Sequence, residues 1–198
     1  MDIDKEMMEY YSKAIDAANE EMDYYTNQLE HFSSVLDHYK NIVEIVNGEY
    51  DYERTGAILE GRVKTLQNEM KVSEDYYAML KREQEAAKAA LASATGEKEK
   101  ELLEANLKAI TEAVIEAEEE MLSKTEEWAE ATKELMENTM AKAARAMEMA
   151  FTDGLTFDFL SDSMDRLSTY QDEYLTKTNQ MYETEKLMRT AQQAADKT

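Results

Sequence analysis

Apolar residues recur along the chain at alternating spacings of three and four, the pattern of helices that pack in coiled coils. Over the first 25 residues the spacing is 4-4-3-4-4-3, an eleven-residue rhythm. Its positions are Ile3, Met7, Tyr11, Ala14, Ala18, Met22 and Tyr25. From Ala18 to Val46 the spacing is a regular 4-3 heptad. We therefore expect one long helix, with a nearly straight or slightly right-handed line of contacts first and a left-handed coiled coil after it.

Three short breaks, each with a glycine, interrupt the later pattern: Asn47-Gly48, Ser93-Ala94-Thr95-Gly96 and Thr152-Asp153-Gly154. Heptad spacing resumes after each break. After the first it runs through Tyr52, Gly56, Leu59, Val63, Leu66, Met70, Ser73, Tyr77, Leu80, Gln84, Ala87 and Leu91. After the second it runs through Leu103, Leu107, Ile110, Val114, Ala117, Met121, Trp128 and Leu135. After the third its positions are Leu160, Met164, Leu167, Tyr174, Thr178, Met181 and Met188.

The expected fold is therefore all-α and elongated, with about four long helices in an antiparallel coiled-coil or helical-hairpin arrangement. Residues 1–93 are predicted to form one hairpin with its turn near residues 47–50. Residues 94–198 are predicted to form a second helical pair with its turn near residues 152–156. A single elongated bundle of all four helices is the alternative.

Composition supports long helices and excludes several functions. The chain of 198 residues has no proline and 5 glycines, too few for the turns of a β protein. Its formal net charge of -22 argues against binding to nucleic acid or to anionic membranes. It has no cysteine and hence no disulfide or thiolate metal site. No apolar run is long enough for a membrane span, and the amino terminus lacks the apolar run of a signal peptide.

The two histidines do not predict a metal site. His31 and His38 lie seven residues apart, about 10.5 Å along a helix, which is too far to bind one ion together. A di-iron bundle would have Glu-x-x-His, whereas Gln28 and Val35 stand three residues before the histidines. No phosphate loop, zincin motif or nucleophile elbow occurs. We therefore predict no catalytic residues, no metal, no cofactor and no small-molecule substrate.

Two apolar clusters are candidates for contact with a protein partner. One is the Phe corner at the third break, consisting of Phe151, Leu155, Phe157 and Phe159, which either plugs a bundle end or docks a neighbour. The other is the Met face, consisting of Met136, Met140 and Met147, because methionine surfaces repack easily around different ligands.

Three stretches resemble parts of the long helical tape-measure-like proteins of tailed bacteriophages. They read EEMDYYTNQLEHFSSVLDHYKNIVEIVNGEYDYE, EEEMLSKTEEWAEATKELMENTM and EYLTKTNQMYETEKLMRTAQQAADKT. The resemblance implies a helical virion component that spans or sets part of the tail, packed beside copies of itself and tube proteins. The chain is far shorter than a whole tape measure. Its last residues also read as a helix cut short, so we expect a segment of a larger protein.

The leading hypothesis is therefore a non-enzymatic structural coiled-coil segment that binds proteins or itself through its helices. The alternative is a helical interaction module, such as an adaptor, secreted effector or chaperone-like bundle, that docks partners through the Phe corner or the Met face. A carboxylate-bridged di-metal enzyme is a third, weaker reading, because paired carboxylates with histidine are missing. The phage resemblance implies a place in the virion tail, and the alternative implies the cytoplasm.

Overall fold

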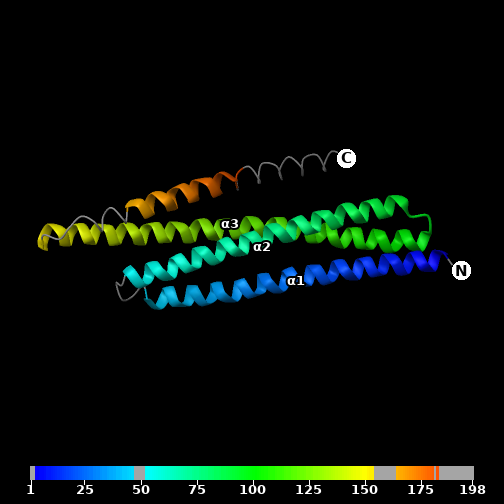
Figure 1. Cartoon of the computed structure of the whole chain (residues 1–198), viewed down its shortest axis with the longest axis horizontal. Coiled ribbons are helices and arrows are strands. Elements are labelled where there is room, and N and C mark those ends of the chain that lie inside the picture. Colours follow the sequence, from blue (N-terminus) through cyan, green and yellow to red (C-terminus); the bar gives the residue numbers. More distant parts are fainter. Residues whose placement is uncertain (1–2, 47–51, 154–163, 181, 183–198) are drawn as a thin grey trace. The chain divides into compact units, whose positions relative to one another are not determined.

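The computed structural model describes residues 3–46, 52–153, 164–180 and 182 (Figure 1). Three long helices are α1 (Ile3–Val46), α2 (Tyr52–Ser93) and α3 (Glu97–Asp153). A fourth helix covers residues 164–180. No strand occurs within these described ranges, so the predicted all-α class is confirmed. The predicted turn near residues 47–50 lies outside the described residues. Of the predicted turn near residues 152–156, residues 154–156 also lie outside them.

The predicted break at residues 93–96 separates α2 from α3, and the carboxylate of Glu99 stabilises the start of α3. The backbone N–H groups of Thr95 and Gly96 donate to Glu99 Oε2 at 3.2 and 3.1 Å. These N–H groups have no partner within the helix, and a carboxylate near a helix N-terminus also interacts favourably with the helix dipole. The local sequence Thr-Gly-Glu-Lys-Glu thus ends one helix and begins the next.

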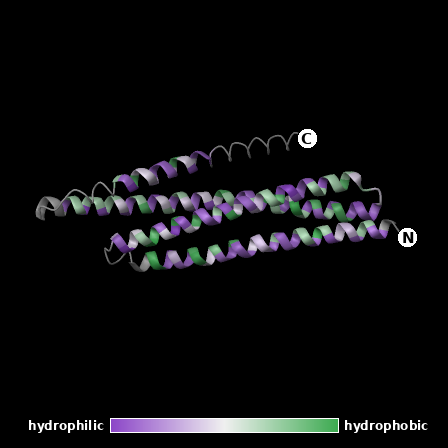
Figure 2. Ribbon diagram, viewed as in Figure 1, coloured by the Kyte–Doolittle hydropathy of each residue, from purple (hydrophilic) through white to green (hydrophobic). Residues whose placement is uncertain are grey.

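The described residues group into two compact units, each containing parts of α1, α2 and α3. The first unit is drawn from residues 1–32 and 69–121, and the second from residues 33–68 and 122–198. Along the helices of both units, hydrophobic residues are interspersed with hydrophilic ones (Figure 2). The two domains expected from the sequence, 1–93 and 94–198, stay a prediction.

In the first unit α2 and α3 run antiparallel around an apolar core. The Tyr77 hydroxyl donates to Glu118 Oε1 at 2.6 Å, and the Gln84 amide donates to Thr111 Oγ1 at 3.0 Å. Moving seven residues forward on α2 moves the partner seven residues back on α3, as a heptad pairing requires. The apolar core of this unit includes the cluster Met79, Leu80, Ala87, Ile110, Val114 and Ala117.

The start of α1 differs from the expected eleven-residue rhythm. Met7 and Ala14, which that rhythm buries, are exposed, while Met8 and Ile15 are half-buried. The predicted straight line of contacts stays a prediction. The positions from Met8 onward follow an ordinary heptad, so the eleven-residue rhythm is wrong at Met7 and Ala14. The physical reason is that Ile15 buries more apolar surface than Ala14 does.

In the second unit a close approach joins α1 to α2. A Cβ atom added to Gly61 of α2 would lie 2.8 Å from the Tyr39 hydroxyl oxygen of α1, so a larger residue here would require the Tyr39 ring to shift. The core of this unit includes Leu59, Val63 and Leu66 of α2, with Trp128 and Leu135 of α3. These residues occupy the predicted heptad positions.

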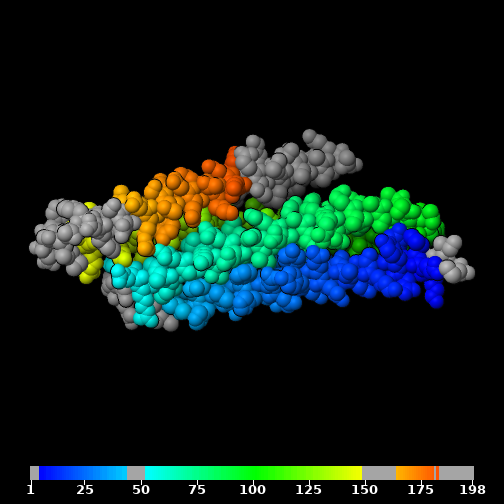
Figure 3. All heavy atoms as spheres, in the orientation of Figure 1, coloured from blue at the N-terminus to red at the C-terminus, as the bar shows by residue number. Residues whose placement is uncertain are grey.

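The fourth helix lies on this unit with its described residues at most half-buried. In Figure 3 its spheres, coloured orange, lie against the first turns of α2. Leu167, Tyr174 and Thr178 are half-buried, as their heptad positions predict, but Met164 is 59% exposed, so its predicted buried position is wrong. Leu160, Met181 and Met188 lie outside the described residues.

Candidate functional site: the helix seat on α2 and its clefts

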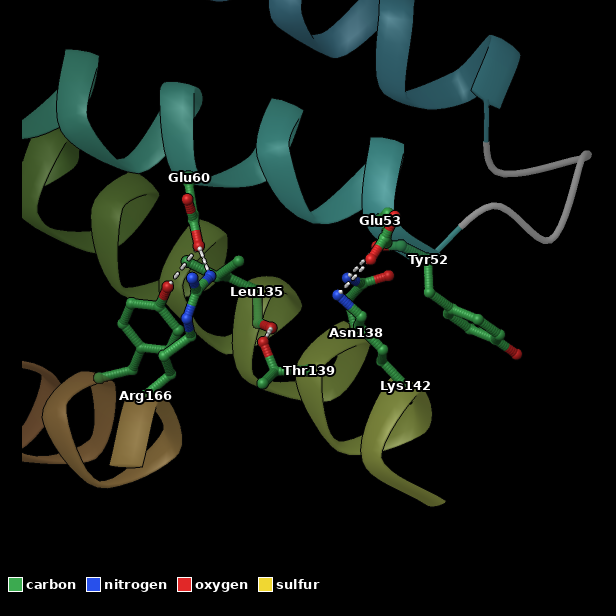
Figure 4. Close-up of polar contacts among 9 residues, drawn as sticks. Tyr52, Glu53, Glu60, Leu135, Asn138, Thr139, Lys142 and Arg166 are labelled. Carbon is green, nitrogen blue, oxygen red and sulfur yellow. Dashed lines mark hydrogen bonds and ion pairs between the residues drawn. The ribbon is translucent and has the colours of Figure 1, made fainter. Parts of the chain in front are cut away.

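A group of polar contacts in the second unit joins α2 to the fourth helix. Glu60 Oε1 accepts hydrogen bonds from Arg166 Nη1 at 3.0 Å and from the Tyr170 hydroxyl at 2.8 Å (Figure 4). Gln67, seven residues later on α2, donates to Glu173 Oε2 at 3.3 Å. We call the surface around Glu60 and Gln67 the helix seat.

Glu60 changes the acidity of the tyrosine that it binds. Partial burial, and then the hydrogen bond to the Glu60 carboxylate, raise the pKa of Tyr170 to about 12. A neutral phenol can donate to a carboxylate, whereas a phenolate would repel it. Tyr170 therefore acts as a hydrogen-bond donor up to strongly alkaline pH.

A cleft of about 270 Å³ adjoins the helix seat between α2 and α3. Two polar contacts cross it: Asn138 Nδ2 donates to the Tyr52 carbonyl at 3.1 Å, and Lys142 Nζ lies 3.2 Å from Glu53 Oε1 (Figure 4). Its lining residues are Tyr52, Glu53, Gly56, Ala57, Glu60, Leu135, Asn138, Thr139, Lys142 and Arg166. Small side chains on α2 leave this space, and charged side chains of both signs form its rim.

A second cleft, of about 590 Å³, is lined by residues of α1, α2 and α3. Its central contact is between Arg62 Nη1 and Glu134 Oε2 at 2.7 Å, where the Arg62 side chain is only 9% exposed. Its lining residues are Lys40, Val43, Tyr52, Thr55, Leu59, Arg62, Glu134, Glu137, Asn138 and Ala141. The guanidinium that would otherwise attract an anionic ligand is already bound by a carboxylate of the same unit.

These groups are arranged for contacts between helices. Glu60, Glu53 and Glu134 each face a cation of another helix, so the charges of the clefts are largely neutralised in pairs. Among the described residues no group of three histidine or carboxylate side chains comes together as a metal site would need. None of the described helices is apolar over a stretch long enough to cross a bilayer.

Of the residues predicted to contact partners, those that the structure describes do not line these two clefts. In the Met face, Met136 is half-buried, whereas Met140 is 58% and Met147 39% exposed. In the Phe corner, Leu155, Phe157 and Phe159 lie outside the described residues. Phe151 falls in the last turn of α3, and its side chain is likewise outside what the structure describes. The two histidines are exposed on α1.

The heptad pattern did not predict a row of buried polar residues along α2. Thr55, Arg62 and Glu69 are buried and Tyr76 is half-buried, each seven residues from the next. The heptad assignment placed these residues beside the apolar positions, where polar side chains normally face water. Their regular spacing was visible in the sequence, but their burial arises because α2 contacts both α1 and α3.

Comparison with known proteins adds no relative: no protein-family model matches the chain, and no curated protein or solved structure is significantly similar to it.

Proposed function

We propose that the chain is a non-enzymatic structural module that holds helices together in a fixed register, as a segment of a tape-measure-like tail protein would. The observation that carries this proposal is the heptad-spaced pairing of polar contacts, 77 with 118 and 84 with 111, across a continuous apolar core. Such polar contacts specify the alignment of two helices at some cost in stability. Alignment is what a structural segment has to provide.

If the chain is part of a tape measure, the length that it adds to the tail can be measured. The longest helix among the described residues has 57 residues and spans about 86 Å, whereas 198 residues in one continuous helix would span about 300 Å, at 1.5 Å per residue. If the chain is part of a tape measure, deleting its codons in frame should shorten the tail by an amount between these limits. Electron microscopy of the virions measures this directly.

An in-frame duplication of the same codons is the matched control, because it should lengthen the tail by the same amount. Unchanged tail length in both mutants would reject a length-setting role. If the genome that encodes this chain has no tail genes, the phage assignment is rejected, whereas the proposal of a structural module is unaffected.

A second candidate, a helical interaction module, is favoured by the exposure of Met140 and Met147. They lie seven residues apart and hence on one face of α3. Replacing both with serine should abolish binding of a specific partner captured from the source cells and identified by mass spectrometry. The control is serine at the half-buried Met136, with circular dichroism to verify folding; unchanged capture by the double variant would reject this candidate.

A further inference from the structure

The side chains of the fourth helix are less buried in the second unit than those of the other helices. None of its described residues is fully buried, whereas Trp128, Ala131 and Thr132 of α3 in the same unit have no exposed surface. Its apolar side chains Met164 and Leu175 are 59% and 51% exposed. A helix with so little buried apolar surface opens at low cost compared with the core helices.

Two polar contacts between this helix and α2 are exposed to solvent. The Arg166–Glu60 pair is 64% and 44% exposed on its two sides, and the Gln67–Glu173 contact is also exposed. Water competes for such groups, so they align the helix without holding it firmly. Arg166 with Glu60 and Glu173 with Gln67 have the same offset of 106 residues, which sets the helix parallel to α2 in one register.

We propose that the fourth helix exchanges between copies of the chain, so that residues 164–180 of one copy occupy the helix seat of another. The contacts within one copy indicate which segment would fill the helix seat of another. Glu60 binds Arg166 and Tyr170, and Gln67 binds Glu173. The fourth helix of a second copy carries the same side chains at the same spacing. Exchange of an identical element replaces each contact with its equal and is a low-cost route to association. The inference does not depend on the phage resemblance.

The absence of cysteine from the whole chain makes a clean test available. Gln67→Cys is introduced in one preparation and Glu173→Cys in another that carries a size tag, which leaves the Glu60 contacts intact. The two are mixed in enough salt to screen the net charge of -22, which otherwise repels the copies. A short bismaleimide then joins thiols that lie close together, and gel electrophoresis shows the product.

We expect a covalent heterodimer at a yield several-fold above that of a control mixture of Gln67→Cys with Leu175→Cys. Leu175 is two residues from Glu173 and therefore points to the other side of the helix. Arg166→Glu, added to the Glu173→Cys chain, should lower the yield because it places two carboxylates together.

The chain with both Gln67→Cys and Glu173→Cys identifies the alternatives. Cross-linking only within this chain, together with no excess of heterodimer in the mixture, would show that the helix stays on its own copy and would overturn the inference. If neither the double-cysteine chain nor the mixture is cross-linked, the fourth helix leaves the helix seat and no other copy replaces it. That result would also overturn the inference. Circular dichroism of each variant verifies that the helical content is unchanged.

Discussion

Buried threonine hydroxyls on α3 differ in whether a backbone carbonyl of the same helix accepts a hydrogen bond from them. On α3, Thr139 Oγ1 donates to the Leu135 carbonyl at 2.8 Å. Thr132, one heptad earlier and fully buried, has no hydrogen-bond partner for its Oγ1 among the described residues. Because a buried hydroxyl without a partner loses its hydration and gains nothing, the two threonines should respond differently to replacement.

Thr132→Val should raise the free energy of unfolding by about 1 kcal/mol, because valine has nearly the same shape and no hydroxyl to desolvate. Thr139→Val removes a hydrogen bond that is made, so it should be neutral or destabilising. Urea unfolding followed by circular dichroism measures both. Equal effects of the two substitutions would contradict this assignment.

The buried guanidinium of Arg62 gives a second prediction at this scale. Glu134→Ala leaves this charge without its carboxylate and should lower the free energy of unfolding by about 1–3 kcal/mol, less than for a fully buried pair because Glu134 is 43% exposed. Arg62→Met should cost less than Glu134→Ala, because an apolar side chain of similar length fills the space without a charge. The double variant Arg62→Met/Glu134→Ala should recover much of the loss, and strict additivity would exclude a coupled pair.

At the scale of helices, hydrogen bonds from tyrosine to glutamate align neighbouring elements. Tyr77 of α2 donates to Glu118 of α3, and Tyr170 of the fourth helix donates to Glu60 of α2. Partial burial, followed by the bond to the carboxylate, raises the pKa of Tyr77 and of Tyr170 to about 12 in each case. The ordinary value for tyrosine is about 10.

This gives an alkaline limit to stability. Because the folded pKa is raised, the stabilisation is complete below about pH 10 and is lost as pH rises through about 12. Tyrosinate absorbance followed against pH should therefore include a late step near pH 12 from these two tyrosines. Tyr77→Phe and Tyr170→Phe should each remove one late step; a single common step in the wild-type protein would contradict the assignment.

The helices were largely predictable from the sequence, and the contacts between them were not. The heptad positions of α2, such as Leu59 and Leu66, and the break before Gly96 follow from spacing and glycine placement. Met7 and Met164 were misplaced because several registers of an amphipathic helix fit one apolar pattern, and only the neighbouring helix selects among them. The helix seat at Glu60 was invisible for the same reason: its partner lies 106 residues away.

At the scale of the whole chain, the excess of acidic residues sets the response to salt. The chain has 44 acidic and 22 basic residues, so carboxylates repel one another in the folded state more than in the expanded unfolded state. Salt also weakens attractive pairs such as Arg82–Glu21 and Lys13–Glu9, but these are exposed, so water and ions already screen them and each contributes little. The repulsion is spread over the whole chain, so its screening should dominate.

We therefore expect sodium chloride to raise the melting temperature as the Debye length falls from about 30 Å at 0.01 M to about 8 Å at 0.15 M. Each kcal/mol gained should appear as about 2–4 °C for a chain of this size. Thermal unfolding followed by circular dichroism measures the shift. A variant with several exposed glutamates of α3 changed to glutamine, for instance Glu112, Glu119 and Glu126, should melt higher at low salt and respond less to added salt. If its response to salt equals that of the wild type, repulsion among carboxylates is not the cause.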